Sequence, residues 1–269
     1  MHESLEDRRM WRSVIRVGAA VALFAVVHSV LASRPAKQAA ARVFGERNRN
    51  GLYRPFYIGQ SLVTFGLLVL YIRRQPSAEL YCVRGPLAYV MLAGQGAALL
   101  WLIAAARQVG ILRITGAKNL LVWSDGERAD PEPEAQGPAL DAEGLSTGPG
   151  PFAYTRHPLN FGFLPIFWLW PRMTTNLLTF NLAATLYLVA GSVHEEIRLR
   201  KAYGSLYGEY ERSGVPFFLP HAPPSLSALP GSSLNAPSPF ADSEDDRPAL
   251  PGESTEARPR YRPPSLDPS

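Results

Sequence analysis

The sequence predicts an all-α, polytopic integral membrane protein with about five transmembrane helices. Its apolar residues gather in long blocks of about 20 residues, the length that crosses roughly 30 Å of hydrocarbon as a helix. Arginines border these blocks, whereas acidic residues concentrate in segments 124–150 and 221–269 of the 269-residue chain. The mean hydropathy of -0.05 therefore averages a membrane domain with two polar segments.

Four blocks are long enough to span a bilayer on their own. They are Val14–Ala32, Tyr53–Ile72, Pro86–Ala106 and Met173–Val193. A shorter apolar block, Leu159–Trp170, continues through Pro171 and Arg172 into the last of them. We therefore expect a C-terminal helical hairpin, in which the short helix crosses only if it begins at the interface near Tyr154.

The first block has two interpretations, a membrane helix and a cleaved signal peptide. The run Val30-Leu31-Ala32 fits a cleavage site, but acidic residues precede the block and His28 interrupts it. These features, and the spans that follow, favour a retained helix.

The positions of lysine and arginine predict the orientation. With five spans, 14 basic residues near the span ends fall on the side of the C-terminus and seven on the other side. This places the C-terminus in the cytoplasm, although the cluster Arg8, Arg9 and Arg12 favours the opposite orientation.

Composition divides the chain into two domains. Residues 1–220 form the membrane domain, in which segment 124–150, with seven acids and five glycines, is expected to be a flexible cytoplasmic insert that could act as a lid. Segment 221–269 holds 11 prolines and nine serines. Such a tail buries too little apolar surface to offset the entropy of ordering, so we expect it to be disordered.

Several classes of function are disfavoured. Cys82 is the only cysteine, and the histidines do not fall at metal-ligand spacing, so no metal site is predicted. The chain has no P-loop motif and no glycine-rich dinucleotide motif after a strand. The arginines border apolar spans and form no stripe typical of nucleic-acid binding. A transporter is disfavoured because the chain has no internal repeat and its polar groups gather at one membrane face.

Two polar motifs flank the predicted hairpin. Arg156-His157-Pro158 precedes the short helix, and Glu195-Glu196 ends the last one. A hairpin would bring both motifs to one membrane face, where clustered ionisable groups indicate function. A site with arginine, histidine and two carboxylates suits a zwitterionic ligand with an amine and a carboxylate.

A structural interpretation of the same residues remains open. Arg156 would then reach toward lipid head groups, and the two glutamates would pair with Arg198 and Arg200 on an interfacial helix. The tyrosines that follow would form an aromatic belt; they are Tyr203, Tyr207 and Tyr210.

Taken together, these motifs resemble those of the membrane methyltransferase superfamily, which includes isoprenylcysteine and phospholipid methyltransferases. The C-terminal set carries most of the resemblance: Tyr154-x-Arg156-His157-Pro158, Glu195-Glu196 and Tyr207-x2-Tyr210. His28-Ser29 in the first helix and Arg54-x2-Tyr57 in the second are similar to the methanethiol S-methyltransferase and NnrU branch.

The resemblance implies S-adenosylmethionine bound at the cytoplasmic end of the last two helices of a bacterial inner-membrane protein. The residues it implies for the cofactor are Tyr154, Arg156, His157, Pro158, Asn160, Glu195, Glu196, Tyr207 and Tyr210. Of these, His157 and Arg156 would be catalytic, with His157 accepting a proton from a thiol. His28, Arg54 and Tyr57 are the candidates for contacting the substrate, and a core role for His28 is equally open.

One position departs from the resemblance. The superfamily commonly carries tyrosine two residues after the proline of the Arg-His-Pro motif, where this chain has Asn160. Two hypotheses follow: a membrane methyltransferase acting on a small thiol or lipid-soluble acceptor, and a non-enzymatic NnrU-type protein linked to nitrogen-oxide metabolism. Asn160 favours the second, and the intact Arg-His-Pro and Glu-Glu motifs favour the first.

Overall fold

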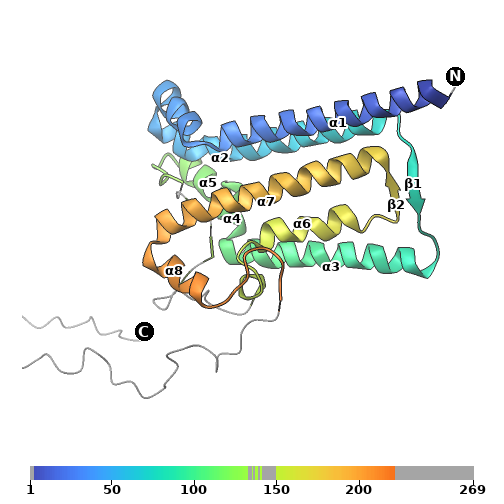
Figure 1. Cartoon of the computed structure of the whole chain (residues 1–269). Helices are drawn as coiled ribbons and strands as arrows, with labels where there is room; N and C mark the ends of the chain where they lie inside the picture. Colours follow the sequence, from blue (N-terminus) through green and yellow to red (C-terminus); the bar gives the residue numbers. More distant parts are fainter. Residues whose placement is uncertain (1–2, 133–134, 136, 139, 141–149, 222–269) are drawn as a thin grey trace, which may run out of the picture. The chain divides into compact units, whose positions relative to one another are not determined.

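The computed structural model describes residues 3–132, 135, 137, 138, 140 and 150–221 (Figure 1). By its contacts the chain divides into two units, Met1–Ser225 and Leu226–Ser269. The second unit, and with it the predicted disordered tail apart from His221, lies outside the described residues. Part of the predicted flexible insert, within 133–149, lies outside them as well.

The described part of the chain is almost entirely helical, which confirms the all-α prediction. The elements in order are α1 (Glu3–Ala32), α2 (Arg34–Arg74), β1 (Glu79–Cys82), α3 (Pro86–Val109), α4 (Ile111–Thr115), α5 (Ala117–Ser124), the 3-10 turn η1 (Pro151–Ala153), α6 (Pro158–Trp168), β2 (Arg172–Thr174), α7 (Thr175–Tyr203) and α8 (Ser205–Arg212). In Figure 1, α7 lies between the α1–α2 pair and the α3–α6 pair.

Among the described residues, four helices are long and apolar enough to cross a membrane: α1 from Asp7, α2, α3 and α7. Their outward faces carry large apolar side chains, such as Leu67, Leu100 and Leu186, which are 60%, 68% and 71% exposed. In water such surfaces would be unfavourable, whereas lipid chains solvate them. The chain is therefore a polytopic integral membrane protein, as predicted.

The predicted fourth span is shorter than a bilayer is thick. Helix α6 has 11 residues, about 16 Å at 1.5 Å per residue, roughly half of the hydrocarbon core. It lies along α3, where Trp101 Nε1 donates to the Pro158 carbonyl (3.0 Å) and Gln95 Nε2 to the Ile166 carbonyl (2.9 Å). The expectation of five spanning helices is thus corrected to four, plus this short helix.

An extended segment after α6 completes the fifth passage of the chain. It leads into β2, which pairs antiparallel with β1 at the end of the bundle opposite α4, α5 and α8 (Figure 1). Asn181 Nδ2 donates to the Phe167 carbonyl (2.6 Å), and Tyr81 OH donates to the Trp170 carbonyl (3.2 Å). Non-helical backbone is tolerated at membrane depth where protein groups satisfy it in this way.

The segment between the first two predicted spans is helical rather than a loop. Ser33 caps the start of α2, accepting from the Ala36 amide (3.4 Å), and Pro35 occupies the first turn. Gly45 has a φ of 78°, and this left-handed conformation bends the helix there. The helices extend past their apolar blocks because polar residues continue the helix outside the membrane.

Helix α1 is packed into the bundle against α7 and α2. Val17 and Val21 are buried with Leu68, Phe180 and Ala184. The first predicted block is therefore part of the helical core.

Candidate functional site

The loop before α6 is fixed in place by the segment that follows α8. Thr155 is fully buried; its hydroxyl donates to the Phe218 carbonyl (3.0 Å) and accepts from the His157 amide (3.3 Å). The Arg156 amide donates to the Pro216 carbonyl (2.9 Å). Pro158 then begins α6, where no amide donor is needed. Arg156 and His157 are thereby turned toward α7.

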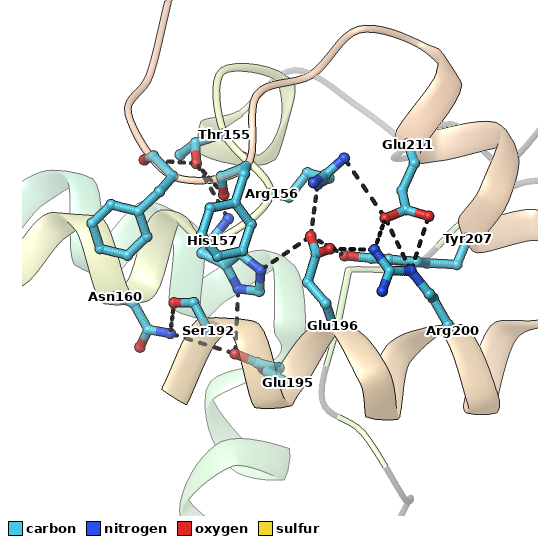
Figure 2. Close-up of polar contacts among 12 residues, drawn as sticks. Thr155, Arg156, His157, Asn160, Ser192, Glu195, Glu196, Arg200, Tyr207 and Glu211 are labelled. Carbon is cyan, nitrogen blue, oxygen red and sulfur yellow. Dashed lines mark hydrogen bonds and ion pairs between the residues drawn. The ribbon is translucent and has the colours of Figure 1, made fainter. Parts of the chain in front are cut away.

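Glu196 on α7 is the centre of the cluster (Figure 2). It is 4% exposed, and its carboxylate lies 2.8 Å from Arg156 Nε and 2.8 Å from Arg200 Nη2. Tyr207 OH donates to it (3.2 Å), and His157 Nε2 lies 3.4 Å away. A buried carboxylate requires such compensation.

Glu211 on α8 completes what we call the ion cluster, namely Arg156, Glu196, Arg200 and Glu211. Arg200 Nη2 lies 2.6 Å from Glu211 Oε1, and Arg156 Nη1 lies 3.9 Å from the same oxygen. The hydrogen bond from Arg200 holds the pKa of Glu211 below its usual range. Burial, followed by the charge of Glu196, raises the pKa of Tyr207, so its hydroxyl stays protonated and donates. Two cations and two carboxylates balance each other.

Beside the ion cluster lies a second polar group. The His157 ring is 3% exposed; its Nδ1 lies 3.4 Å from Glu195 Oε2, and the Phe217 ring meets its face edge-on at 5.0 Å. Asn160 Nδ2 donates to Ser192 Oγ (2.7 Å) and approaches Glu195 Oε2 (3.5 Å). Figure 2 shows these side chains converging between α6 and α7.

A cavity of about 710 Å³ lies between α1, α2, α6 and α7. Because its lining residues follow in order along the helices, it has a polar end, a middle and an apolar end. The polar end has Lys37, Arg54, Glu132, Asn160, Glu195 and Arg198. The apolar end has Val21, Phe65, Leu68, Phe180 and Ala184. Roughly 300–1,000 Å³ is typical of sites for small ligands.

Between the two ends, His28 and Tyr57 line the cavity. Tyr57 OH lies 2.6 Å from His28 Nε2, and Ser61 Oγ lies 3.1 Å from His28 Nδ1. The Arg54 guanidinium lies 5.6 Å from the centre of the Tyr57 ring. The three substrate candidates of the sequence, His28, Arg54 and Tyr57, therefore share one cavity with Asn160 and Glu195.

Glu132 brings the described part of the 124–150 insert to the polar end. Its carboxylate pairs with Lys37 and lies 3.9 Å from Arg54 Nε. The buried Asn50 side chain also donates to the Ala129 carbonyl (2.9 Å), so this part of the insert contacts α2. Whether the insert is flexible or moves as a lid stays a prediction.

The predicted site residues divide into two groups. Asn160 and Glu195 line the cavity, whereas Arg156, His157 and Glu196 lie behind Glu195 and contact one another. The Glu196–Arg200 pair of the structural interpretation is also present.

The remaining candidates lie farther from the cavity. Pro158 is buried, Tyr207 supports Glu196, and Tyr210, 1% exposed, donates to the Phe152 carbonyl (2.6 Å). Tyr154 is 40% exposed and its ring lies 5.9 Å from that of Trp101. The role of each as a cofactor residue stays a prediction.

Sequence reasoning missed several contributors. Ser192 lies three and four residues before the two glutamates and so shares their helix face, a signal that was available. Glu211 follows Tyr207 by four residues and offered the same signal. Lys37 and Glu132 are 95 residues apart, and nothing local indicates their contact.

Apolar membrane helices packed around a cavity with one charged end define a class of polytopic membrane protein with an internal cavity. Within that class, the chain belongs to the NnrU family, whose model matches residues 17–171.

The chain is also similar to curated relatives. A methanethiol S-methyltransferase of Pseudomonas deceptionensis is 30% identical over 79% of this chain and 73% of its own length. That of Mycobacterium tuberculosis is 30% identical over 74% of each chain. Methanethiol S-methyltransferase 2 of Bradyrhizobium diazoefficiens is 41% identical over 26% of each chain. No solved structure matches the chain significantly.

Proposed function

We propose that the chain is an integral membrane methyltransferase that uses S-adenosylmethionine and acts on a small thiol or lipid-soluble acceptor. The observation that carries the proposal is the cavity, with its charged end beside Glu195 and its apolar end between α1, α2 and α7. The similarity to enzymes named methanethiol S-methyltransferase supports it.

The charges at the polar end fit this donor. Glu195 suits the ammonium or the sulfonium, while Lys37, Arg54 and Arg198 suit the carboxylate. Arg156, which the resemblance implies as a cofactor residue, pairs with Glu196 and lies outside the cavity lining. In the proposal, Arg156 holds Glu196 in place. Glu196 contacts His157, and His157 in turn orients Glu195.

When bound, the donor supplies an electrophilic methyl group on a sulfonium. The residues of the cavity orient the two reactants for an in-line displacement and exclude water from between them. Alignment and desolvation can supply much of the rate of such a reaction. The apolar end, which lies between lipid-facing helices, suits an acceptor that partitions into the bilayer.

Calorimetry of the purified full chain in nanodiscs tests the proposal with S-adenosylmethionine and S-adenosylhomocysteine. We expect saturable binding of both. Glu195→Gln keeps the side-chain volume and removes the charge, so affinity should fall about ten- to a hundredfold, from roughly 1.5–3 kcal/mol for a charge-assisted contact. If Glu195 meets the sulfonium, the loss should be larger for S-adenosylmethionine than for S-adenosylhomocysteine, whose sulfur carries no charge.

Glu209→Gln is the matched control, since Glu209 is exposed and pairs with Arg212 on the same helix. Its affinity should equal that of the wild type. Absence of binding by the wild-type chain would overturn the proposal and favour a non-enzymatic role for this member of the NnrU family.

A further inference from the structure

Three polar side chains that donor binding does not require also line the cavity. His28, Tyr57 and Ser61 lie at the boundary between its polar and apolar ends. Both ring nitrogens of His28 face hydroxyls: Tyr57 OH is 2.6 Å from Nε2 and Ser61 Oγ is 3.1 Å from Nδ1. Placing an ionisable side chain within a membrane span is costly, so such a residue is a candidate for function.

The surroundings hold this group in one orientation. The Phe24 ring stacks on His28 with ring centres 5.6 Å apart, and the Tyr187 ring meets it edge-on at 6.3 Å. Gln60 Nε2 donates to Ser61 Oγ (3.0 Å). Tyr57 is 7% exposed, and its hydroxyl retains a lone pair that can accept a further hydrogen bond.

We propose that Tyr57 and His28 form a proton relay that deprotonates a thiol acceptor bound at the apolar end of the cavity. This inference rests on the proposed methyltransferase function and names the acceptor class and the base. The relay uses the tautomer in which Tyr57 OH donates to Nε2 and Nδ1–H donates to Ser61 Oγ, an arrangement that the two distances allow.

The step balances as follows. The S–H proton of the acceptor passes to the Tyr57 oxygen while the Tyr57 proton passes to His28 Nε2, and the bonding pair stays on the acceptor sulfur. That sulfur forms a bond to the methyl carbon, and the carbon–sulfonium bond breaks with its electron pair going to the donor sulfur. His28 gains the positive charge that the donor sulfur loses, so the net charge in the cavity is unchanged.

Charge conservation matters in this environment. Creating a separate charge in a medium of low dielectric constant is costly, whereas moving one between neighbouring sites is not. His157, the base suggested by sequence, is 3% exposed and lies behind Glu195, outside the cavity lining. His28 lies in the lining itself.

Two thiols of similar size but different acidity test the relay. Ethanethiol and 2,2,2-trifluoroethanethiol differ because fluorine makes the second more acidic, so it is largely thiolate at pH 8.5 and needs no base. General-base catalysis is worth roughly 10²–10⁴-fold. We expect His28→Gln and Tyr57→Phe to lower kcat with ethanethiol by at least tenfold and to lower kcat with the fluorinated thiol far less.

Calorimetry accompanies the kinetics, and donor affinity should stay within twofold of the wild type. His221→Gln is the control, because this exposed histidine lies at the end of the described chain and uses its backbone amide to contact Tyr154. It should leave both rates unchanged.

Equal losses with both thiols, or no loss with either, would overturn the relay while leaving the methyltransferase proposal in place. A wild-type chain that binds the donor but methylates neither thiol would overturn the thiol assignment and the relay together. A wild-type chain that binds no donor would overturn the proposed function itself.

Discussion

Glu196 has more polar partners than its position in the sequence suggests. It is buried near the end of a membrane helix, and two arginines, a tyrosine and a histidine surround its carboxylate. Removing one partner of a buried ion pair leaves an uncompensated charge, which costs more than the pair contributes. Residues that sequence reasoning assigned to ligand binding are therefore expected to act also on stability.

Arg156→Ala should lower the stability of the protein. Arg200 and Tyr207 still compensate Glu196, so we expect a loss of about 1–3 kcal/mol rather than complete unfolding. The measurement is the thermal midpoint in detergent. Arg212→Ala, which removes only an exposed pair with Glu209, should change stability by less than about 1 kcal/mol. Equal midpoints for wild type and Arg156→Ala would contradict this role.

Glu211 should give the stability a specific dependence on pH. Its pKa is lowered in the folded protein by the hydrogen bond from Arg200. Its contribution is therefore fully present above the unfolded value of about 4.3 and is lost as the pH falls through the lower folded value. Glu211→Gln should lose less thermal stability than the wild type as the pH falls from 5 to 3. Identical decreases in the two proteins would show that Glu211 is not responsible.

At the scale of elements, α6 shows how a short helix can serve a membrane passage. The apolar block Leu159–Trp170 is recognisable in the sequence, and so is its insufficient length. The partners that satisfy the last turn of α6 and the chain just after it, Gln95, Asn181 and Tyr81, come from α3, α7 and β1. Isolated polar residues within apolar blocks indicate such contacts but do not identify the partner.

Asn181→Leu tests this support. The substitution keeps the number and branching of the side-chain heavy atoms but removes the donor to the Phe167 carbonyl, and an unsatisfied buried carbonyl costs about 1–3 kcal/mol. We expect a lower thermal midpoint than in the wild type. Leu182→Ala, at a neighbouring position that is 50% exposed on the outer face of α7, should have a much smaller effect. A thermal midpoint unchanged by Asn181→Leu would contradict the inference that Asn181 stabilises the end of α6.

At the scale of the whole molecule, the five passages place β1 and the α4–α5 region at opposite ends of the helices (Figure 1). The chain changes side at each passage, so the number of passages decides which segments share a side of the membrane. This holds whether or not each passage is a full helix. The absolute orientation, with the C-terminus in the cytoplasm, stays a prediction from the distribution of arginine and lysine.

Thiol labelling can test both points. Cys82 is exposed in β1 and is the only cysteine of the chain, so it should react with a membrane-impermeant reagent from outside the cell. Asp130→Cys in a Cys82→Ser background should react only from the cytoplasmic side. Labelling of both positions from one side would contradict the five passages. Labelling from opposite sides in the reverse sense would contradict only the orientation.

The sequence by itself determined the membrane class, the positions of the four long spans and the two polar motifs beside the last helices. These features are local, because a run of about 20 apolar residues is driven into lipid by its own transfer free energy. The resemblance to the methanethiol S-methyltransferase and NnrU branch also indicated His28, Arg54 and Tyr57 as substrate candidates. Sequence did not show that these residues share a cavity with Asn160 and Glu195.

Only the tertiary structure decided which charged groups face a ligand. Whether Arg156 or Lys37 lines the cavity depends on which helix packs against α7 and at what rotation, and those contacts join residues as far apart as Ser13 and Asn176. Glu195 and Glu196 have identical side chains. Glu196 is nevertheless buried between two arginines, whereas Glu195 faces a cavity. The difference arises from helix packing, because adjacent residues on a helix point about 100° apart.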